Sequence, residues 1–391
     1  MTAFALSEQQ QAFARQVRQA AAEQLRPIAD AGQPGQLNRE LIKAMGDLGL
    51  LARLFPGISG GSPSRGAPLS REAPLSRQAS ATDLCLLRES LATQCTEAET
   101  ALALQGLGGY PILQSGTDEA VRRWLPAIAA GDAVAAFALT EPDAGSDAAA
   151  LALRAEPDGA GWRLTGQKTW ISNAPEADVY TVFARTTDGA GARGVTAFTV
   201  PADRTGLHGE HLDMLSPHPI GTLTFDGVPV YRGEMLGEPD RGFGVAMRTL
   251  DLFRPSVGAF AVGMAQAALD AAVRHAGTRT AFGGPLIRQQ AVAHLLAEMA
   301  TRTEAARLLV YAAAAAHDAG GSGTAARSAM AKLFATETAQ YVVDAAVQVH
   351  GARALQRGHL LEHLYREVRA PRIYEGASEV QRTIIARELY R

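Results

Sequence analysis

One carboxylate near the C-terminus is placed where it could act as a general base. Glu375 lies between Tyr374 and Gly376, after Pro371 and before a polar run that can begin a helix at Ser378. This order predicts a short connection between helices, from which a side chain can project into a cleft. Desolvation there would raise the carboxyl pKa from about 4.3 towards working pH, as a general base requires. Taken alone, Glu375 is more simply a helix cap or a surface charge.

Two other segments combine residue types that suit a planar ligand. Residues 140–147 follow an expected strand and form a loop rich in small and polar residues, while residues 166–174 place Trp170 beside hydroxyl groups. Such loops let a ligand approach the main chain closely. Separately, the first segment reads as a Pro-Asp turn and Trp170 as a core residue. Together, the two segments indicate a specific binding site.

Composition excludes several classes of protein. The chain has 391 residues, 47% of them hydrophobic and 20% charged, with a formal net charge of -3. This balance supplies no basic field for nucleic acid. No signal peptide and no run of 18 apolar residues is recognisable, so we expect a cytoplasmic protein without a membrane span. Two cysteines, Cys85 and Cys95, are too few for a disulfide framework and are assigned packing roles.

The elements that must position these residues fall into three parts. Helical periodicity predicts helices that begin at Ser7 and after Asn38, with further helices near residues 84–93 and 118–130. Residues 57–80 are rich in Gly, Pro and Ser, and they read as a loop. Short alternating segments then predict antiparallel strands at 135–139, 161–165, 179–184, 195–200 and 222–228.

Beyond Gly244 the chain reads as helical again. Long alanine-rich segments are expected at 257–275, 288–317, 324–350 and 355–369, with Gly320–Gly323 as a loop. The predicted fold is mainly α with a central β domain. Its parts are an N-terminal helical domain (1–134), a middle antiparallel β domain (135–240) and a C-terminal four-helix bundle (241–391).

Three short matches to known motifs are set aside. Residues 189–194 spell a dinucleotide fingerprint but lead into a strand, so they predict a hairpin turn. His359, Glu362 and His363 match a zinc-protease pattern without a third ligand, and we assign no metal. Residues 106–109 lack the Lys-Ser/Thr of a phosphate loop and are interpreted as a helix terminus.

The segments that carry the chemistry together resemble the acyl-CoA dehydrogenase family. The resemblance covers nearly the whole chain and is weakest over residues 57–80. Its diagnostic segments are residues 140–147, 166–173, 279–283, 348–351 and 373–382. The family has an N-terminal helical domain, a middle β domain and a C-terminal bundle, and it is commonly a homotetramer that binds FAD.

The resemblance implies roles for individual residues. Thr140 and Ser172 match positions that hydrogen-bond the flavin ring, and Trp170 matches the aromatic residue that packs against it. The positions that resemble contacts to the FAD of a neighbouring subunit are Arg279, Phe282, Gln348 and Gly351. Those that resemble substrate contacts are Ser146, Asp251, Arg254, Tyr374 and Gly376, although a structural ion pair is an alternative for Asp251 and Arg254.

Glu375 matches the catalytic base of the family. Some relatives place the base on an earlier helix, at the position of Phe253 in this chain, which cannot accept a proton. The implied mechanism removes the α-proton with Glu375 while the β-hydrogen leaves as hydride to the flavin. The product is a trans-2-enoyl-CoA, and an electron-transfer flavoprotein then receives the electrons. The chain departs from the family where Ala377 replaces a usual Thr and Ala352 and Ala354 replace usual glycines.

Three alternatives stay open from the sequence. The same fold could act on an acyl group attached to a carrier protein. It could instead use oxygen directly, as an acyl-CoA oxidase. A protein of another class, a non-catalytic binding protein on this fold, would share the sequence pattern without the chemistry. Bleaching of a bound flavin by acyl-CoA thioesters, followed by reoxidation in air, distinguishes these possibilities.

Overall fold

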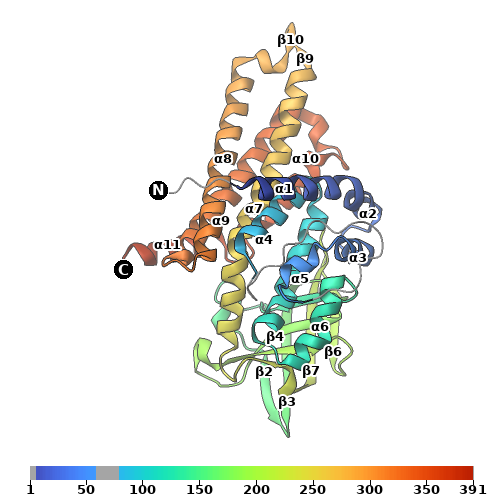
Figure 1. Cartoon of the computed structure of the whole chain (residues 1–391), viewed down its shortest axis with the longest axis vertical. Helices are drawn as coiled ribbons and strands as arrows, with labels where there is room; N and C mark the ends of the chain where they lie inside the picture. Colours follow the sequence, from blue (N-terminus) through green and yellow to red (C-terminus); the bar gives the residue numbers. More distant parts are fainter. Residues whose placement is uncertain (1–5, 59–78, 391) are drawn as a thin grey trace. The chain divides into compact units, whose positions relative to one another are not determined.

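The structure, a computed structural model, describes residues 6–58 and 79–390. The chain forms two compact units, each assembled from segments that are distant in sequence (Figure 1). Unit 1 comprises Met1–Arg26, Ser80–Glu99 and Asp251–Arg391, and unit 2 comprises Pro27–Ala79 and Thr100–Leu250. Residues 59–78, most of the segment expected to be a loop, lie outside the described residues.

Helices dominate the chain, as predicted. Their bounds are α1 (Glu8–Ala20), α2 (Arg26–Ala31), α3 (Arg39–Asp47), α4 (Ala81–Ala92), α5 (Thr96–Ser115), α6 (Asp118–Ala130), α7 (Gly242–Thr278), α8 (Gln290–Asp318), α9 (Thr324–His350), α10 (Leu360–Glu367) and α11 (Ser378–Leu389).

Local capping signals explain why several helix starts were predictable. Ser7 and Gln10 form a reciprocal capping box at the start of α1, and the Asn38 side chain accepts from the Leu41 amide at the start of α3. These side chains satisfy backbone donors that a helix leaves unpaired. The expected helix at 118–130 coincides with α6, which ends at Gly131 in the left-handed conformation.

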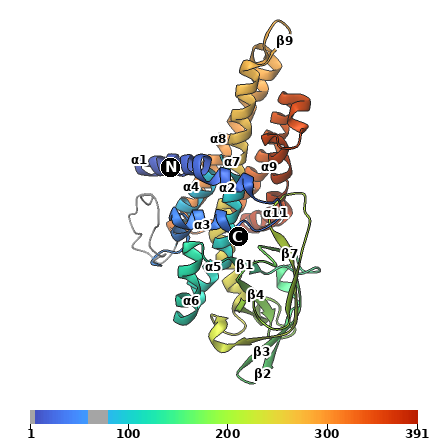
Figure 2. The same ribbon diagram turned by 90° about the vertical axis from the view of Figure 1, so that its right-hand side faces the viewer.

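The interpretation of residues 106–109 as a helix terminus is wrong. They lie inside α5, where a Cβ on Gly108 would come within 2.5 Å of the Ala136 backbone nitrogen. The Gly108 carbonyl accepts a hydrogen bond from Thr181 Oγ1 at 2.8 Å. Gly108 therefore lets the helix approach β1 of the sheet closely, and Gly109 lets it approach Phe55 and Ile128, so these glycines do not end the helix. Figure 2 shows the sheet strands with α6 alongside.

The sheet of unit 2 has the order β6-β7-β3-β2-β4-β5-β8, with β1 paired to β4. Its strands are β1 (Ala135–Ala138), β2 (Arg154–Asp158), β3 (Gly161–Ser172), β4 (Val179–Arg185), β5 (Val195–Pro201), β6 (Leu207–His211), β7 (Ile220–Tyr231) and β8 (Met235–Leu236). Most strand pairs are antiparallel, as expected for the middle domain, but β1 and β2 each pair with β4 in parallel. The hairpin expected at 189–194 is confirmed, since β4 and β5 pair antiparallel around it.

Unit 1 is built on long helices whose small residues allow close packing. A Cβ on Gly258 of α7 would lie 2.7 Å from Val310 of α8 and 3.5 Å from the Ala335 Cβ of α9. The helix expected from residue 257 in fact begins at Gly242 and continues through Pro255. The fourth expected segment shrinks to α10, and α11 packs against α9 as an additional helix.

Helix α7 is also, among the described residues, the one helix long and apolar enough to cross a membrane. However, 83% of its apolar window is buried inside the protein. This burial identifies α7 as a core helix, because a membrane span would present that surface to lipid. Cys85 and Cys95 are buried free thiols, in agreement with the packing roles predicted for them.

Candidate functional site

Glu375 lies on the connection between a short 3-10 turn, η8 (Ala370–Arg372), and α11, as the sequence predicted. Its backbone has φ of +49°, in the left-handed region that residues with a Cβ rarely adopt. Gly376 follows with φ of +92°, which a glycine tolerates. The base candidate therefore stands on a strained turn, a feature that is concentrated at functional sites.

Two buried side chains hold the backbone of this turn. Lys332 of α9 donates from Nζ to the carbonyl oxygens of Tyr374 at 3.1 Å and of Gly376 at 2.6 Å. Gln381 of α11 donates from Nε2 to the Gly376 carbonyl at 2.8 Å and to the Glu375 carbonyl at 3.4 Å. Both side chains have an exposed fraction of 0%. The carbonyl oxygens of Tyr374, Glu375 and Gly376 thus all accept hydrogen bonds from side chains of α9 and α11.

The Glu375 carboxylate, in contrast, has an unused oxygen. Glu375 as a residue is half-buried, but its Oε2 atom is buried and has no hydrogen-bond partner among residues 6–58 and 79–390. Burial raises the pKa of Glu375, and the nearby charges of Arg88, Lys332 and Arg254 act in the opposite direction. A buried acceptor that no protein donor satisfies costs free energy unless a ligand uses it.

The cations around Glu375 are themselves arranged by partners. Arg88, with an exposed fraction of 2%, forms an ion pair with Glu99 and donates from Nη1 to Ser256 Oγ at 2.8 Å. Arg254 Nη1 lies 2.6 Å from Asp251 Oδ1, which is the structural ion pair considered as an alternative for these residues. Neither arginine forms an ion pair with Glu375 in the structure. They act on the base as charges at a distance.

In unit 2, the two segments predicted to bind a planar ligand come together. The Thr169 amide donates to the Thr140 carbonyl at 3.0 Å, which ties the loop after β1 to β3. The register of β3 against β7 is irregular between Lys168 and Ile171, and Trp170 within this irregularity has φ of +52°. Its side chain is 48% exposed, so Trp170 is not the core residue that a tryptophan in a strand usually is. Ser172 ends β3 nearby.

A buried ion pair fixes this loop. Lys168 Nζ donates to Glu141 Oε1 and to the Leu139 carbonyl, both at 2.8 Å. Glu141 in turn accepts from the amides of Ala152 at 2.6 Å and Leu153 at 2.9 Å. The pair holds both ends of the segment that contains Ser146, whose own side chain is exposed.

The four residues predicted to reach a neighbouring subunit's FAD lie at the ends of the long helices of unit 1. Arg279 follows α7, and Phe282 lies in the turn between β9 (Thr280–Ala281) and β10 (Gly284–Pro285), with φ of +52° and an exposed fraction of 90%. Gln348 is exposed near the end of α9, and Gly351 follows that helix with φ of +65°. The rings of His275 and His350 stack at 4.2 Å and join the ends of α7 and α9.

Arg279 and Phe282 of unit 1 suit a ligand that has an anionic group and an aromatic ring system. The Arg279 guanidinium is exposed and has no ion-pair partner within the described part of the chain, so it is available to a pyrophosphate. Trp170 and Phe282 present exposed ring faces from strained backbones. An FAD molecule offers both chemistries, and among residues 6–58 and 79–390 no hydrogen bond or ion pair engages the Arg279 side chain instead.

Backbone strain marks several of the predicted site residues. The described residues other than glycine with positive φ are Trp170, Asn173, Asp240, Phe282 and Glu375. Three of them are residues assigned to the site from the sequence, and Asn173 lies in the same segment as Trp170. Sequence patterns do not reveal φ, so this agreement comes from independent information.

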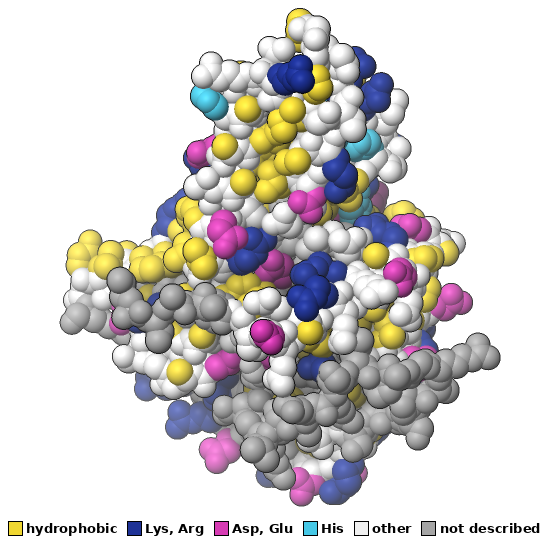
Figure 3. Space-filling view, turned by 45° about the horizontal axis from the view of Figure 1, so that its top comes forward, with side chains coloured by type: hydrophobic (Ala, Val, Ile, Leu, Met, Phe, Trp, Pro, Cys, Tyr) yellow, Lys and Arg dark blue, Asp and Glu magenta, His cyan; other side chains and the backbone are white. Residues whose placement is uncertain are grey.

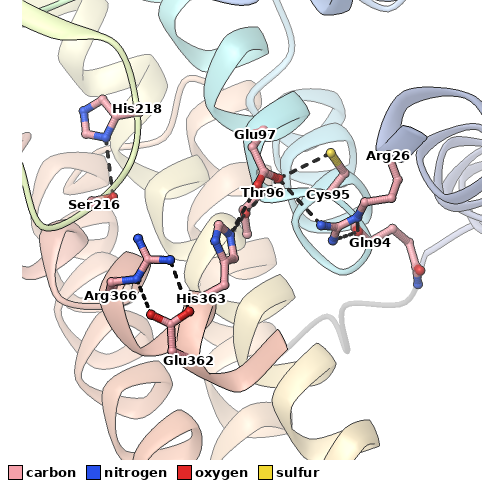
Figure 4. Close-up of polar contacts among 10 residues, drawn as sticks. All are labelled: Arg26, Gln94, Cys95, Thr96, Glu97, Ser216, His218, Glu362, His363 and Arg366. Atoms are coloured by element: carbon pink, nitrogen blue, oxygen red, sulfur yellow. Dashed lines mark hydrogen bonds and ion pairs between the residues drawn. The ribbon is translucent and has the colours of Figure 1, made fainter. Parts of the chain in front are cut away.

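The side chains of the zinc-protease-like motif at residues 359–363 form interactions with other protein residues. Figure 4 shows His363 pointing towards Thr96 and Glu97, with His363 Nε2 at 2.6 Å from Thr96 Oγ1. Glu362 instead accepts from Arg366 Nε at 2.7 Å. The described residues contain no group of three potential metal ligands. The motif therefore links helices α5 and α10 within unit 1.

Sequence reasoning missed four residues that shape these sites, namely Arg88, Glu141, Lys168 and Lys332. A charged residue within an apolar stretch, such as Ala331-Lys332-Leu333-Phe334, is a signal that could have found Lys332, but Glu141 and Lys168 stand in polar stretches that carry no such signal. Asp251, Arg254, Tyr374, Gly376 and Glu375 lie in unit 1, and Thr140, Ser146, Trp170 and Ser172 lie in unit 2.

Comparisons with known proteins agree along the whole chain. Family models for the N-terminal, middle and C-terminal domains of acyl-CoA dehydrogenases match residues 7–132, 136–228 and 240–390. The cyclohexane-1-carbonyl-CoA dehydrogenase of Geobacter metallireducens is 35% identical over 99% of this chain and 98% of that protein.

Solved structures are similar over the same length. Butyryl-CoA dehydrogenase from Megasphaera elsdenii has a TM-score of 0.89 and 33% identity, covering 99% of this chain and 100% of that one. A chain from a study of the electron transferring flavoprotein of Acidaminococcus fermentans has a TM-score of 0.90, 33% identity and 99% coverage of both chains. The FAD complex of PigA has a TM-score of 0.88 and 28% identity, again covering 99% of both.

Proposed function

Because the chain belongs to the acyl-CoA dehydrogenase family of FAD-dependent oxidoreductases, we propose that it oxidises an acyl-CoA to the trans-2-enoyl-CoA, with Glu375 as the catalytic base. The observation that carries the proposal is the buried, unpartnered Oε2 atom of Glu375. The α-hydrogen of a thioester is acidic enough for a carboxylate to remove when the carbonyl is polarised at the same time.

The environment of Glu375 suits this role. Burial raises its pKa, which makes it a stronger base than an exposed carboxylate. The charges of Arg88, Lys332 and Arg254 act against that rise and favour the ionised carboxylate, the form that accepts a proton. Phe253, next to Arg254, is buried and apolar, and no second carboxylate stands at that position.

The backbone of the same turn can polarise the thioester carbonyl. The Glu375 amide makes no hydrogen bond within residues 6–58 and 79–390, whereas the carbonyls of Tyr374, Glu375 and Gly376 are all occupied. We infer that this amide donates to the thioester oxygen and that the bond strengthens as the oxygen gains charge. Tyr374, Gly376 and Arg254 would surround the acyl-CoA, and Asp251 would orient Arg254 through their ion pair.

The cofactor supported by the site is FAD, which supplies the acceptor for the β-hydrogen as hydride. Thr140, Ser172 and Trp170 would hold the flavin ring, and Ser146 would contact the arm of the thioester. Arg279, Phe282, Gln348 and Gly351 would hold the FAD of a neighbouring subunit. Arg279 is suited to a pyrophosphate because its planar guanidinium can donate two parallel hydrogen bonds.

An oligomer follows from this assignment, and we propose a homotetramer. Figure 3 shows apolar side chains gathered on one face of the molecule, and the exposed apolar residues of unit 1 include Val273, Ile287, Leu308 and Leu309. A contiguous apolar surface of this kind marks an interface. We also propose that an electron-transfer flavoprotein in the cytoplasm receives the electrons.

The test is replacement of Glu375 by glutamine in the FAD-loaded protein. Glu375→Gln nearly preserves volume, but an amide does not accept the α-proton at neutral pH. We expect single-turnover bleaching of the flavin by acyl-CoA thioesters to slow by at least about 10²-fold, since general-base catalysis is worth about 10² to 10⁴. FAD content and thioester binding should stay close to those of the parent.

Glu379→Gln is the matched control, because Glu379 lies on α11, four residues away, and is exposed. It should bleach at the parent rate. Bleaching of Glu375→Gln within about threefold of the parent rate would exclude Glu375 as the base, because that loss is far below the ~10² minimum. Rapid reoxidation of the reduced parent protein by air would identify an oxidase instead of a dehydrogenase that uses a flavoprotein acceptor.

A further inference from the structure

The interaction between Lys332 and the Glu375 turn has no role in the reaction outlined above. Lys332 comes from the middle of α9, 43 residues before the base, and no part of its side chain is exposed. Its Nζ donates to the carbonyls on both sides of Glu375, those of Tyr374 at 3.1 Å and Gly376 at 2.6 Å. A lysine is seldom buried completely unless its charge and donors are used.

This arrangement determines which way the turn faces. Lys332 and Gln381 together occupy three successive carbonyls, so that side of the peptide planes points into the protein. The Glu375 amide and its Oε2 atom remain without partners in the described part of the chain. A left-handed backbone at a residue with a Cβ persists only where its surroundings hold it. The buried donors of Lys332 and Gln381 provide that restraint.

Lys332 also differs from an ordinary ion-pair partner of the base. It makes no hydrogen bond with the Glu375 carboxylate, yet its charge lowers the pKa of Glu375. Arg88 of α4 and Arg254 of α7 act on Glu375 in the same direction. Burial lowers the pKa of Lys332 itself to about 8, while Glu375, Glu337 and Glu379 oppose that shift. The ammonium group is therefore charged at neutral pH.

We propose that Lys332 is a positioning residue for this reaction. It fixes the strained turn so that the amide and carboxylate of Glu375 face the substrate, and its positive charge favours the carboxylate form of the base without occupying the oxygen that accepts the proton. Gln381 also fixes the turn, but it does not act on the charge state of Glu375, because the Gln381 side chain is neutral. The inference rests on the proposed function, since it assigns a role relative to Glu375 as base.

The difference between the two donors defines the experiment. Lys332→Met removes the donors and the charge, whereas Gln381→Met removes donors alone. In the FAD-loaded protein, we expect Lys332→Met to slow flavin bleaching by about ten- to a hundredfold, the effect of a small misplacement. Its pH profile should move to higher pH by about one unit, because one nearby cation is lost.

Gln381→Met should slow bleaching by about tenfold and leave the midpoint of the pH profile unchanged. Hydrogen exchange of the amides at 374–377 should become faster in both variants, because each loses restraint on the turn. This second measurement does not depend on activity. If Lys332→Met does not accumulate as folded protein, Lys332→Gln, which keeps a donor and loses the charge, should still move the pH profile to higher pH by about one unit.

Failure of this inference is distinguishable from failure of the proposed function. If Glu375→Gln abolishes bleaching while Lys332→Met keeps the parent's rate and pH midpoint, Lys332 is not a positioning residue and Glu375 is still the base. A slower Lys332→Met with unchanged exchange at 374–377 and an unchanged pH midpoint also overturns it. If Glu375→Gln bleaches at the parent rate, the proposed function itself is wrong.

Discussion

Lys168 in unit 2 and Lys332 in unit 1 are both buried and both donate hydrogen bonds to the backbone of a loop. They differ in whether they also bind the neighbouring carboxylate. Lys168 and Lys332 have no exposed surface, and burial lowers the pKa of each to about 8. Each donates to backbone carbonyls of a loop assigned to the functional site. Lys168 also hydrogen-bonds the carboxylate beside it, Glu141, whereas Lys332 leaves the carboxylate of Glu375 untouched.

This difference distinguishes Glu141, whose carboxylate has a structural role, from Glu375, whose carboxylate keeps an oxygen without a partner among the described residues. Glu141 accepts from Lys168 and from two backbone amides, so its charge is fully used within the protein. The charge of Lys332 acts on Glu375 without a direct ion pair, and Glu375 keeps a buried oxygen that has no partner among the described residues. A buried ion pair whose hydrogen-bonding groups are all satisfied makes a loop more rigid. A buried polar group without a partner costs free energy, and it is retained where catalysis needs it.

The largest expected effect is on the satisfied pair. Lys168→Met leaves Glu141 as a buried charge without its cation, and such losses cost about 3–5 kcal/mol of unfolding free energy. Tryptophan fluorescence during urea unfolding of the FAD-saturated protein isolates this effect, because Trp124, Trp162 and Trp170 all lie in unit 2.

A double variant and the other lysine sharpen the comparison. Lys168→Met with Glu141→Leu should recover much of the lost stability, because a buried pair replaced by apolar residues is often neutral. Lys332→Met should leave the fluorescence transition in place, since that residue belongs to unit 1. Equal shifts of this transition in Lys168→Met and Lys332→Met would contradict the distinction.

A smaller effect is expected when only the charge of the structural carboxylate is removed. Glu141→Gln keeps the shape but offers one acceptor oxygen where three donors now converge. Hydrogen bonds to a charged group contribute about 1.5–3 kcal/mol, so we expect a loss of about that size in the same fluorescence assay. FAD retention should fall with it, because the loop from Leu139 to Leu153 is anchored by Glu141. Unchanged unfolding would show that the pair contributes little.

The contrast between the two loops also shows what the sequence could reveal. The starts of α1 and α3, and the position of Glu375 between helices, follow from local signals such as Ser7, Asn38 and Pro371. Helix α5 was missed because Gly108 and Gly109 serve close packing against Ala136 of the sheet and against Phe55, which is a tertiary reason. Resemblance to the family supplied the site residues, but not the positive φ of Trp170 and Glu375. The contacts of Lys332 span more than 40 residues, so no local pattern predicts them.

The smallest expected effect is on the stability of Glu375→Gln. We expect this substitution to maintain or raise stability at neutral pH, whereas we expect Glu141→Gln to lower it. Burial raises the pKa of Glu375 above 4.5, so the folded state binds its proton more tightly than the unfolded state does. Such a group contributes its stability fully below pH 4.5 and loses that contribution as pH rises through the raised folded pKa. In its ionised form the buried carboxylate therefore lowers the stability of the folded state, in keeping with the conflict between stability and activity at functional sites. We expect Glu375→Gln to equal or exceed the parent in stability at pH 7, by up to about 1 kcal/mol, and to lose this advantage at pH 4. Thermal unfolding of the FAD-saturated proteins by circular dichroism at both pH values measures it, and a variant less stable than the parent at pH 7 would show that Glu375 serves the fold as Glu141 does.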